Sequence, residues 1–318
     1  MGRYVLRRVA LSVVTLFLLV SAVFLITSVL PADPGRQVAG PFAPQATVDA
    51  INERLGTDDP VLTQYGRLLK STITFDFGES FQLRQPVNDL LWPAVGRSAK
   101  LVVFGLVLTV PLAIAAGMYA ARKRNTFADR SIVTLGVASS SIPEFVSGVT
   151  LQFLIGVKLG WFETLALAPR GSNLITELRY LTLPALALVV VYFGYIARMT
   201  RAGTINALDA DYTRTAVMKG LPNRRVMRGH VMRNALQPTV SVIGIQIGYL
   251  FSGLIGLELI FNYPGLGRLI YNAVGAKDFP MLSAAVILVG IIYMLCTLGA
   301  DLVIAWMNPR ARMEGARS

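Results

Sequence analysis

The sequence has few of the side chains that build catalytic or metal sites. Its 318 residues include a single cysteine, Cys296, and a single histidine, His230. One of each cannot form a disulfide framework or a zinc site of cysteines and histidines. No lysine follows a glycine, so the Gly-Lys-Ser/Thr loop that binds nucleotide phosphates is absent, as is the Gly-x-Ser-x-Gly elbow of hydrolases. We therefore expect no catalytic residue, no metal site and no cofactor in this chain.

Charged residues are also scarce, at 15% of the chain, whereas hydrophobic residues make up 54%. A soluble domain carries about 25% charged residues, so lipid must face part of this chain. A helix needs about 20 apolar residues to cross a bilayer, and six segments approach or exceed that length. The predicted fold class is all-α, a polytopic membrane protein with six transmembrane helices, the first of them a retained helix and not a cleaved signal peptide. The six segments are 9–30, 100–121, 132–157, 180–197, 239–261 and 282–307.

Basic residues are distributed unevenly between the two sides of the membrane that six spans create. Both termini fall on one side, together with the loops 122–130 and 198–237. These segments hold the whole excess of Lys and Arg behind the formal net charge of +12. The positive-inside rule makes this side cytoplasmic. The charge is thus explained by a membrane, with lipid as a partner and without nucleic acid.

Four regions follow from this topology. Residues 1–30 are the cytoplasmic N-terminus and the first helix, and residues 31–97 are an extracytoplasmic segment. The transmembrane core is 98–307, which includes the cytoplasmic loop 198–237, and residues 308–318 are a cytoplasmic tail.

The extracytoplasmic segment contains helical signals. Asp59-Pro60 predicts the start of an amphipathic helix. A second, short interfacial helix is expected at residues 85–92, before the second span, because Trp92 favours that depth. The apolar face of the amphipathic helix would hold Val61, Leu62, Tyr65, Leu68 and Leu69.

The cytoplasmic loop 198–237 is predicted to form two short helices. Thr215 and Ala216 are small residues in the first helix, and Gly220 suits a left-handed cap at its end. Pro222 suits the opening turn of the second helix. The first helix would project from the membrane, with room at its small residues for a partner groove to come close. A basic loop of this size is typical of docking to another chain.

This loop resembles the EAA loop of ABC importer permeases. The family's Glu-Ala-Ala-x-x-x-Gly falls on Arg214, Thr215, Ala216 and Gly220, with the Glu and the first Ala replaced. The wider pattern Tyr-x-Arg-Thr-Ala-x-x-Lys-Gly-Leu, with Arg-Asn-Ala-Leu-x-Pro downstream, resembles the dipeptide/oligopeptide/nickel importer permeases, and among them the first permease of the pair. Further matches along the chain include Ser141-Ile142-Pro143-Glu144-Phe145 and Pro264-Gly265-Leu266-Gly267.

The resemblance implies the type I ABC importer permease fold in the inner membrane of a prokaryote. It implies that the chain forms half of a pathway for di- or oligopeptides, in a heterodimer with a second permease subunit. Two ATPase subunits, which bind the ATP and Mg, and an extracytoplasmic substrate-binding protein are the other implied partners. In the family the loop forms a coupling helix that inserts into an ATPase subunit. The residues carried over for this role are Tyr212, Thr213, Arg214, Thr215, Ala216, Met218, Lys219, Gly220 and Leu221.

Acidic residues inside apolar segments are costly and therefore candidates for function. Glu144 follows Pro143, which should break the third helix, so Glu144 and Ser141 are candidates for lining the pathway. Glu258 and Asp301 lie near the ends of their spans and are expected to be wetted or salt-bridged. The alternative function is an ion- or proton-coupled secondary transporter. It would be supported by midplane acids and inverted repeats, and the sequence has peripheral acids and no convincing repeat.

Overall fold

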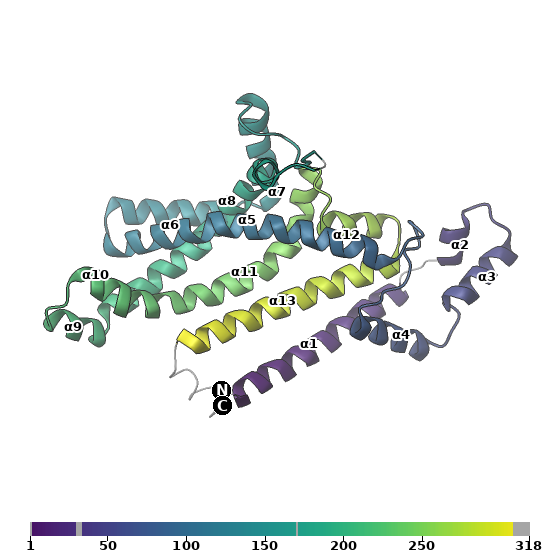
Figure 1. The fold of residues 1–318 in the computed structure, drawn as a ribbon, viewed down its shortest axis with the longest axis horizontal. Coiled ribbons are helices and arrows are strands. Elements are labelled where there is room, and N and C mark those ends of the chain that lie inside the picture. The colour runs from purple at the N-terminus through teal and green to yellow at the C-terminus, as the bar shows by residue number, and fades with distance from the viewer. Residues whose placement is uncertain (1, 30–33, 170, 308–318) are drawn as a thin grey trace. The chain divides into compact units, whose positions relative to one another are not determined.

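A computed structural model describes residues 2–29, 34–169 and 171–307. These residues form helices joined by turns, with an isolated bridge between Glu79 and Pro86 (Figure 1). The elements in chain order are α1 Gly2–Val29, α2 Pro34–Ala39, α3 Gln45–Leu55, α4 Val61–Thr74, α5 Val87–Arg122, α6 Phe127–Ser140, α7 Glu144–Leu151, the π-helix η1 Gln152–Lys158, α8 Leu174–Asp209, α9 Asp211–Met218, α10 Asn223–Arg225, the π-helix η2 Val226–Val231, α11 Met232–Ile260, α12 Leu266–Gly275 and α13 Phe279–Met307.

Four described helices, α1, α5, α8 and α13, are long and apolar enough to cross a membrane. The number rises to six if two bent pairs each count as one span, which agrees with the prediction. One pair is α6 with α7 and η1, bent by 101° between Ser140 and Glu144. Pro143 lacks a backbone N–H and has extended backbone angles, which explains why the helix breaks there, as predicted. The other pair lies along α10 to α11 and is bent by 51°.

The chain divides into two compact units. The first comprises Met1–Val9, Ala99–Tyr263 and Tyr293–Ser318, and the second comprises Ala10–Ser98 and Pro264–Ile292. The predicted division at residues 31, 98 and 308 follows the membrane topology and stays a prediction.

α8 is the central helix of the first unit. α6, α7 and α11 pack against it. Its apolar side chains are buried along most of its length, including Leu183, Leu188 and Ile196. Glycines let the backbones come close: a Cβ on Gly194 would lie 1.8 Å from the carbonyl oxygen of Gly136 in α6. Small residues of this kind are typical of contacts between helices in membranes.

The second unit packs α4 against α1 and α13. The predicted amphipathic helix is confirmed, since α4 begins directly after Pro60. Leu68 and Leu69 pack on a cluster formed by Val20, Val23, Ile287 and Ile291. At the N-terminal end of α4, Val61 and Leu62 are exposed, so only part of the predicted apolar face is used.

The separate interfacial helix predicted before the second span is wrong, because α5 runs without a break from Val87 to Arg122. Pro93 does not end it. Packing overrides this local signal: Leu91, Ala94 and Ser98 are buried, and the Ser98 hydroxyl accepts a hydrogen bond from the Leu266 N–H at 2.7 Å.

Candidate functional site

The loop between α8 and α11 contains the sharp corner that the sequence predicted. α9 ends at Met218, and Gly220 follows with φ of +73°. The Gly220 N–H donates to the Val217 carbonyl at 2.9 Å, and the Leu221 N–H donates to the Ala216 carbonyl at 3.3 Å. These are the two bonds of a Schellman motif, which a left-handed glycine completes. The predicted second helix also exists, but it does not end in the loop, because α10 continues through η2 into α11.

The inner face of this loop is closed by a small hydrophobic cluster. Thr213 is buried, and its hydroxyl donates to the Ala207 carbonyl of α8 at 2.6 Å. Of the predicted coupling residues, Thr213, Ala216 and Leu221 therefore face the loop itself. The cluster consists of Ala207, Ala216, Val226, Val231 and Ala235, with Leu208, Leu221 and Met227 packed against it.

The outer face of α9 is defined by its exposed residues. Val217 and Met218 are 52% and 79% exposed, although both are apolar. The sequence analysis missed Val217, which only the helix's orientation identifies as exposed. Adjacent apolar side chains beside positive charges are typical of a protein interface. The outer face comprises Asp211, Tyr212, Arg214, Thr215, Val217, Met218, Lys219 and Gly220, with Asp211 and Arg214 paired at 3.9 Å.

The two residues predicted to line the pathway, Glu144 and Ser141, have different surroundings from each other. Glu144, the first residue of α7, is half-buried, and its carboxylate accepts a hydrogen bond from the Tyr192 hydroxyl of α8 at 3.0 Å. A Cβ on Gly253 of α11 would lie 2.8 Å from the same carboxylate. Ser141 is exposed, and its hydroxyl donates back to the Val137 carbonyl of α6 at 3.0 Å. Glu144 thus lies where α7, α8 and α11 meet, and Ser141 bonds within its own segment.

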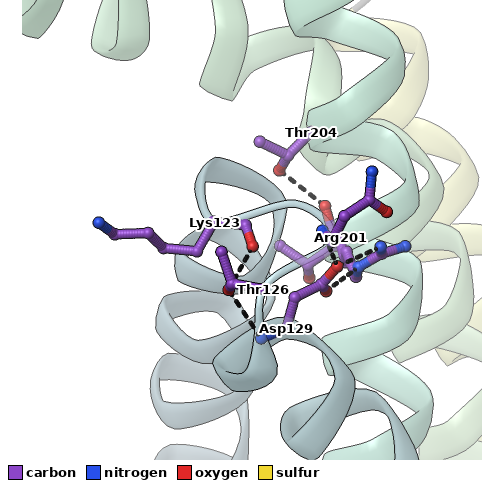
Figure 2. A network of polar contacts seen from close by, with 7 residues as sticks. Lys123, Thr126, Asp129, Arg201 and Thr204 are labelled. Atoms are coloured by element: carbon purple, nitrogen blue, oxygen red, sulfur yellow. Dashed lines mark hydrogen bonds and ion pairs between the residues drawn. The ribbon is translucent and has the colours of Figure 1, made fainter.

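An ion pair that the sequence analysis did not predict joins α6 to α8 (Figure 2). Arg201 donates from Nε and from a terminal nitrogen to the two carboxylate oxygens of Asp129, at 2.5 and 2.7 Å. The Asn125 N–H donates to the same carboxylate at 2.9 Å. Asp129 is 2% exposed. The fork of the guanidinium matches the carboxylate, so this contact sets both distance and orientation.

The other acids in the apolar segments have structural surroundings. Asp301 of α13 pairs with Arg8 at 3.1 Å, as expected of a salt-bridged residue. Glu258 is fully buried near the end of α11, so of its two expected surroundings the wetted one is wrong and the salt-bridged one stays a prediction. Among the described residues, no group of three His, Cys, Asp or Glu side chains could hold a metal ion.

Comparison with known proteins places the whole chain among transport proteins. Residues 113–313 match the family described as binding-protein-dependent transport system inner membrane component, and residues 1–100 match its N-terminal family. The chain is 34% identical over 314 residues to the glutathione transport system permease protein GsiC of Escherichia coli (strain K12), covering 99% of this chain and 100% of that one. It is 33% identical, with the same coverage, to a putative peptide transport system permease protein of Brucella abortus (strain 2308).

Proposed function

Because the chain belongs to the family of binding-protein-dependent transport system inner membrane components, we propose that it forms one half of a heterodimeric pathway for di- or oligopeptides. Family membership makes it a multi-pass inner-membrane permease subunit of an ABC transporter and not an enzyme, as the sequence predicted. It also implies ATPase and substrate-binding partners. The importer is thereby favoured over the ion- or proton-coupled secondary transporter.

The outer face of α9 carries the proposed contact with the ATPase subunit. Its apolar residues Val217 and Met218 are exposed to water in the isolated chain, and a partner groove would remove them from water. Arg214 and Lys219 flank them and would complement acidic groups of the partner. Thr213 and Ala216, which are buried, would support this face from within and not touch the partner.

The proposed mechanism follows the connections of α9. Closure of the ATPase subunits around ATP would push α9, and α8 and α11, which continue from the two ends of the loop, would carry the motion into the membrane. The pathway would then change from inward-open to outward-open and receive peptide from the binding protein. Glu144, at the meeting of α7, α8 and α11, is the proposed polar residue of the pathway.

The proposed orientation places both termini in the cytoplasm. The basic residues of the α8–α11 loop and of the segment before α6 support it, because positive charge is retained on the cytoplasmic side. A cytoplasmic α9 is also what contact with an ATPase requires.

Peptides are proposed as substrates because the two relatives described above are named as glutathione and peptide transport permeases. Glutathione is itself a peptide, so both names agree on the substrate class. Uptake of labelled dipeptides, of glutathione and of nickel by proteoliposomes that contain the complete transporter tests this directly. Uptake of nickel without uptake of any peptide would contradict it.

The coupling proposal is tested by co-purifying the ATPases through a tag on this chain. Met218→Asp places a charge on the outer face of α9, and we expect it to abolish co-purification and ATP-driven uptake. Leu62→Asp on α4 is the matched control, because Leu62 is apolar and 83% exposed but lies outside α9. If Met218→Asp retains wild-type co-purification and uptake, the outer face of α9 is not the ATPase contact.

A further inference from the structure

The Arg201–Asp129 pair lies close to the end of α8 that leads into α9. Arg201 is eight residues before Asp209, the last residue of α8, and α9 begins at Asp211. Asp129 is in the first turn of α6, and Arg201 holds its carboxylate through Nε and one terminal nitrogen (Figure 2). The Asn125 N–H makes a third hydrogen bond to the same carboxylate. The carboxylate is buried, so water does not compete for these bonds as it does at exposed ion pairs.

A second contact joins the same two helices further into the membrane. Gly194 and Gly136 touch backbone to backbone. Each is seven residues, or about two helical turns, from its helix's member of the ion pair. The two contacts therefore lie along one side of each helix, where α6 and α8 run antiparallel. The backbone contact of Gly136 with Gly194 and the ion pair of Asp129 with Arg201 together prevent α6 from sliding or rotating against α8.

The loop that carries α9 is itself fixed to α8 and α11. A Cβ on Gly203 of α8 would lie 2.2 Å from the Ala235 carbonyl of α11, so these backbones touch. The buried hydroxyls of Thr200 and Thr239 are 3.1 Å apart and join the same helices. Together with the Thr213 bond to Ala207, these contacts leave no flexible linker in which a displacement of α9 would be lost.

α8 also contacts the segment beyond the break at Pro143. Tyr192 of α8 holds the carboxylate of Glu144, the first residue of α7. The Ser147 hydroxyl of α7 donates to the Glu144 carbonyl at 2.7 Å and also lies 3.4 Å from the Ala187 carbonyl of α8. Both halves of the broken third span are therefore attached to α8, the cytoplasmic half by the ion pair and the glycine contact.

We propose that Arg201 and Asp129 are positioning residues that transmit the movement of α9 from α8 to α6, so that the cytoplasmic half of the third span moves with the coupling loop. This inference rests on the proposed coupling role of α9. The two residues touch neither peptide nor ATPase in this proposal. They act by keeping α6 and α8 in register while the loop is pushed.

The test uses the complete transporter in proteoliposomes and measures peptide uptake and ATP hydrolysis together. Asp129→Asn removes the charge and keeps the size, Arg201→Gln removes the charge and shortens the side chain, and Arg201→Lys keeps the charge but loses the fork. We expect ATP hydrolysis to continue while uptake per ATP falls about tenfold. The matched control is Lys100→Gln, because Lys100 of α5 pairs with Glu177 of α8, yet the two side chains are 41% and 33% exposed.

A distance measurement separates transmission from simple stabilisation. Spin labels on cysteines at Phe127 of α6 and Asn206 of α8, both exposed, report their separation in a Cys296→Ser background. We expect the same separation in nucleotide-free and vanadate-trapped wild type, and a separation that changes between these states in Asp129→Asn. A wild-type separation that changes between states would overturn the proposal.

The other possible outcomes also distinguish this inference from a structural role of the pair and from the proposed coupling function. If the variants lose thermal stability and uptake in proportion, with uptake per ATP unchanged, the pair is structural only and the proposal is wrong. If Met218→Asp abolishes coupling while Asp129→Asn keeps wild-type uptake per ATP, this inference fails and the coupling function stands. If Met218→Asp has no effect, the coupling function fails first.

Discussion

The hydroxyl of Tyr192 in α8 donates a hydrogen bond to the carboxylate of Glu144, the residue directly after the break in the third span. Glu144 begins α7, and Tyr192 is buried in the middle of α8. Gly253 of α11 leaves the space that the carboxylate occupies. An acidic side chain inside an apolar segment needs such a donor, because an unpaired polar group in hydrocarbon is costly. This pair therefore determines where Glu144 points.

Tyr192→Phe is expected to release Glu144 from α8 while keeping the packing of the ring. A hydrogen bond between membrane helices contributes about 0.6 kcal/mol on average, so the complex should still assemble. Uptake should fall because the carboxylate no longer has one orientation. Tyr195→Phe is the control, since Tyr195 lies on the same helix but is exposed. Equal uptake by the two variants would show that the orientation of Glu144 is unimportant.

Glu144→Gln tests the pathway role itself. The amide oxygen can still accept from Tyr192, so stability and assembly should remain close to wild type, while the negative charge is lost. We expect slower uptake of peptides that carry a free amino group than of amino-blocked peptides, relative to wild type. A uniform effect on both kinds of peptide would argue that Glu144 is structural.

Gly194→Ala should loosen the contact between α6 and α8. The new Cβ would meet the Gly136 carbonyl oxygen at 1.8 Å, which the backbone cannot accommodate without moving. Overpacking of this kind typically costs 1–3 kcal/mol, roughly, so the thermal unfolding midpoint of the purified complex should fall. Gly299→Ala on α13 serves as the control, because nothing lies within 4 Å of its Cβ. That variant should be neutral or slightly stabilising.

Gly220→Val should distort the corner after α9. The left-handed conformation at φ +73° costs a residue with a side chain about 1–2 kcal/mol, and a β-branched side chain is the least tolerant. Because nothing else surrounds this glycine, the effect should be on the direction of α9 and not on packing. Weaker co-purification of the ATPases would reveal it. Gly229→Ala, in the same loop, also meets open space but has no positive φ, so it should behave as wild type.

Asp278→Ala should release the segment 78–84 of the second unit. The buried carboxylate accepts from the Ser80 hydroxyl and from the Phe81 N–H at 3.2 Å, and it caps α13 through the Met281 N–H at 3.4 Å. Leaving such donors unpaired costs about 1–3 kcal/mol each. Limited proteolysis should then cut around residues 78–84 faster than in wild type. Asp58→Ala, at an exposed position, is the control and should leave the cleavage rate unchanged.

Local sequence signals predicted several features because each depends on a property of one or two residues. Pro143 has no N–H to donate, so this residue alone predicts where the third span breaks. Gly220 tolerates positive φ, so the corner after α9 could be placed to the residue. Pro60 likewise marked the start of α4. The separate helix expected at residues 85–92 is wrong, because α5 continues through Pro93 while its neighbours Leu91 and Ala94 are buried.

The sequence by itself determined that the chain is an all-helical membrane protein with about six spans, because apolar length and scarce charge are properties of the chain alone. Only the tertiary structure decided which residues of the loop between α8 and α11 face outward. Ala216 packs in a cluster that reaches Ala235, 19 residues further along the chain, and Thr213 bonds to the Ala207 carbonyl of α8, and no local pattern shows either contact. Asp129 and Arg201 read as two ordinary cytoplasmic charges until α6 and α8 pack antiparallel and bring them together. Ion pairs and hydrogen bonds between segments that are distant in sequence depend on how the helices pack, so the sequence does not show them.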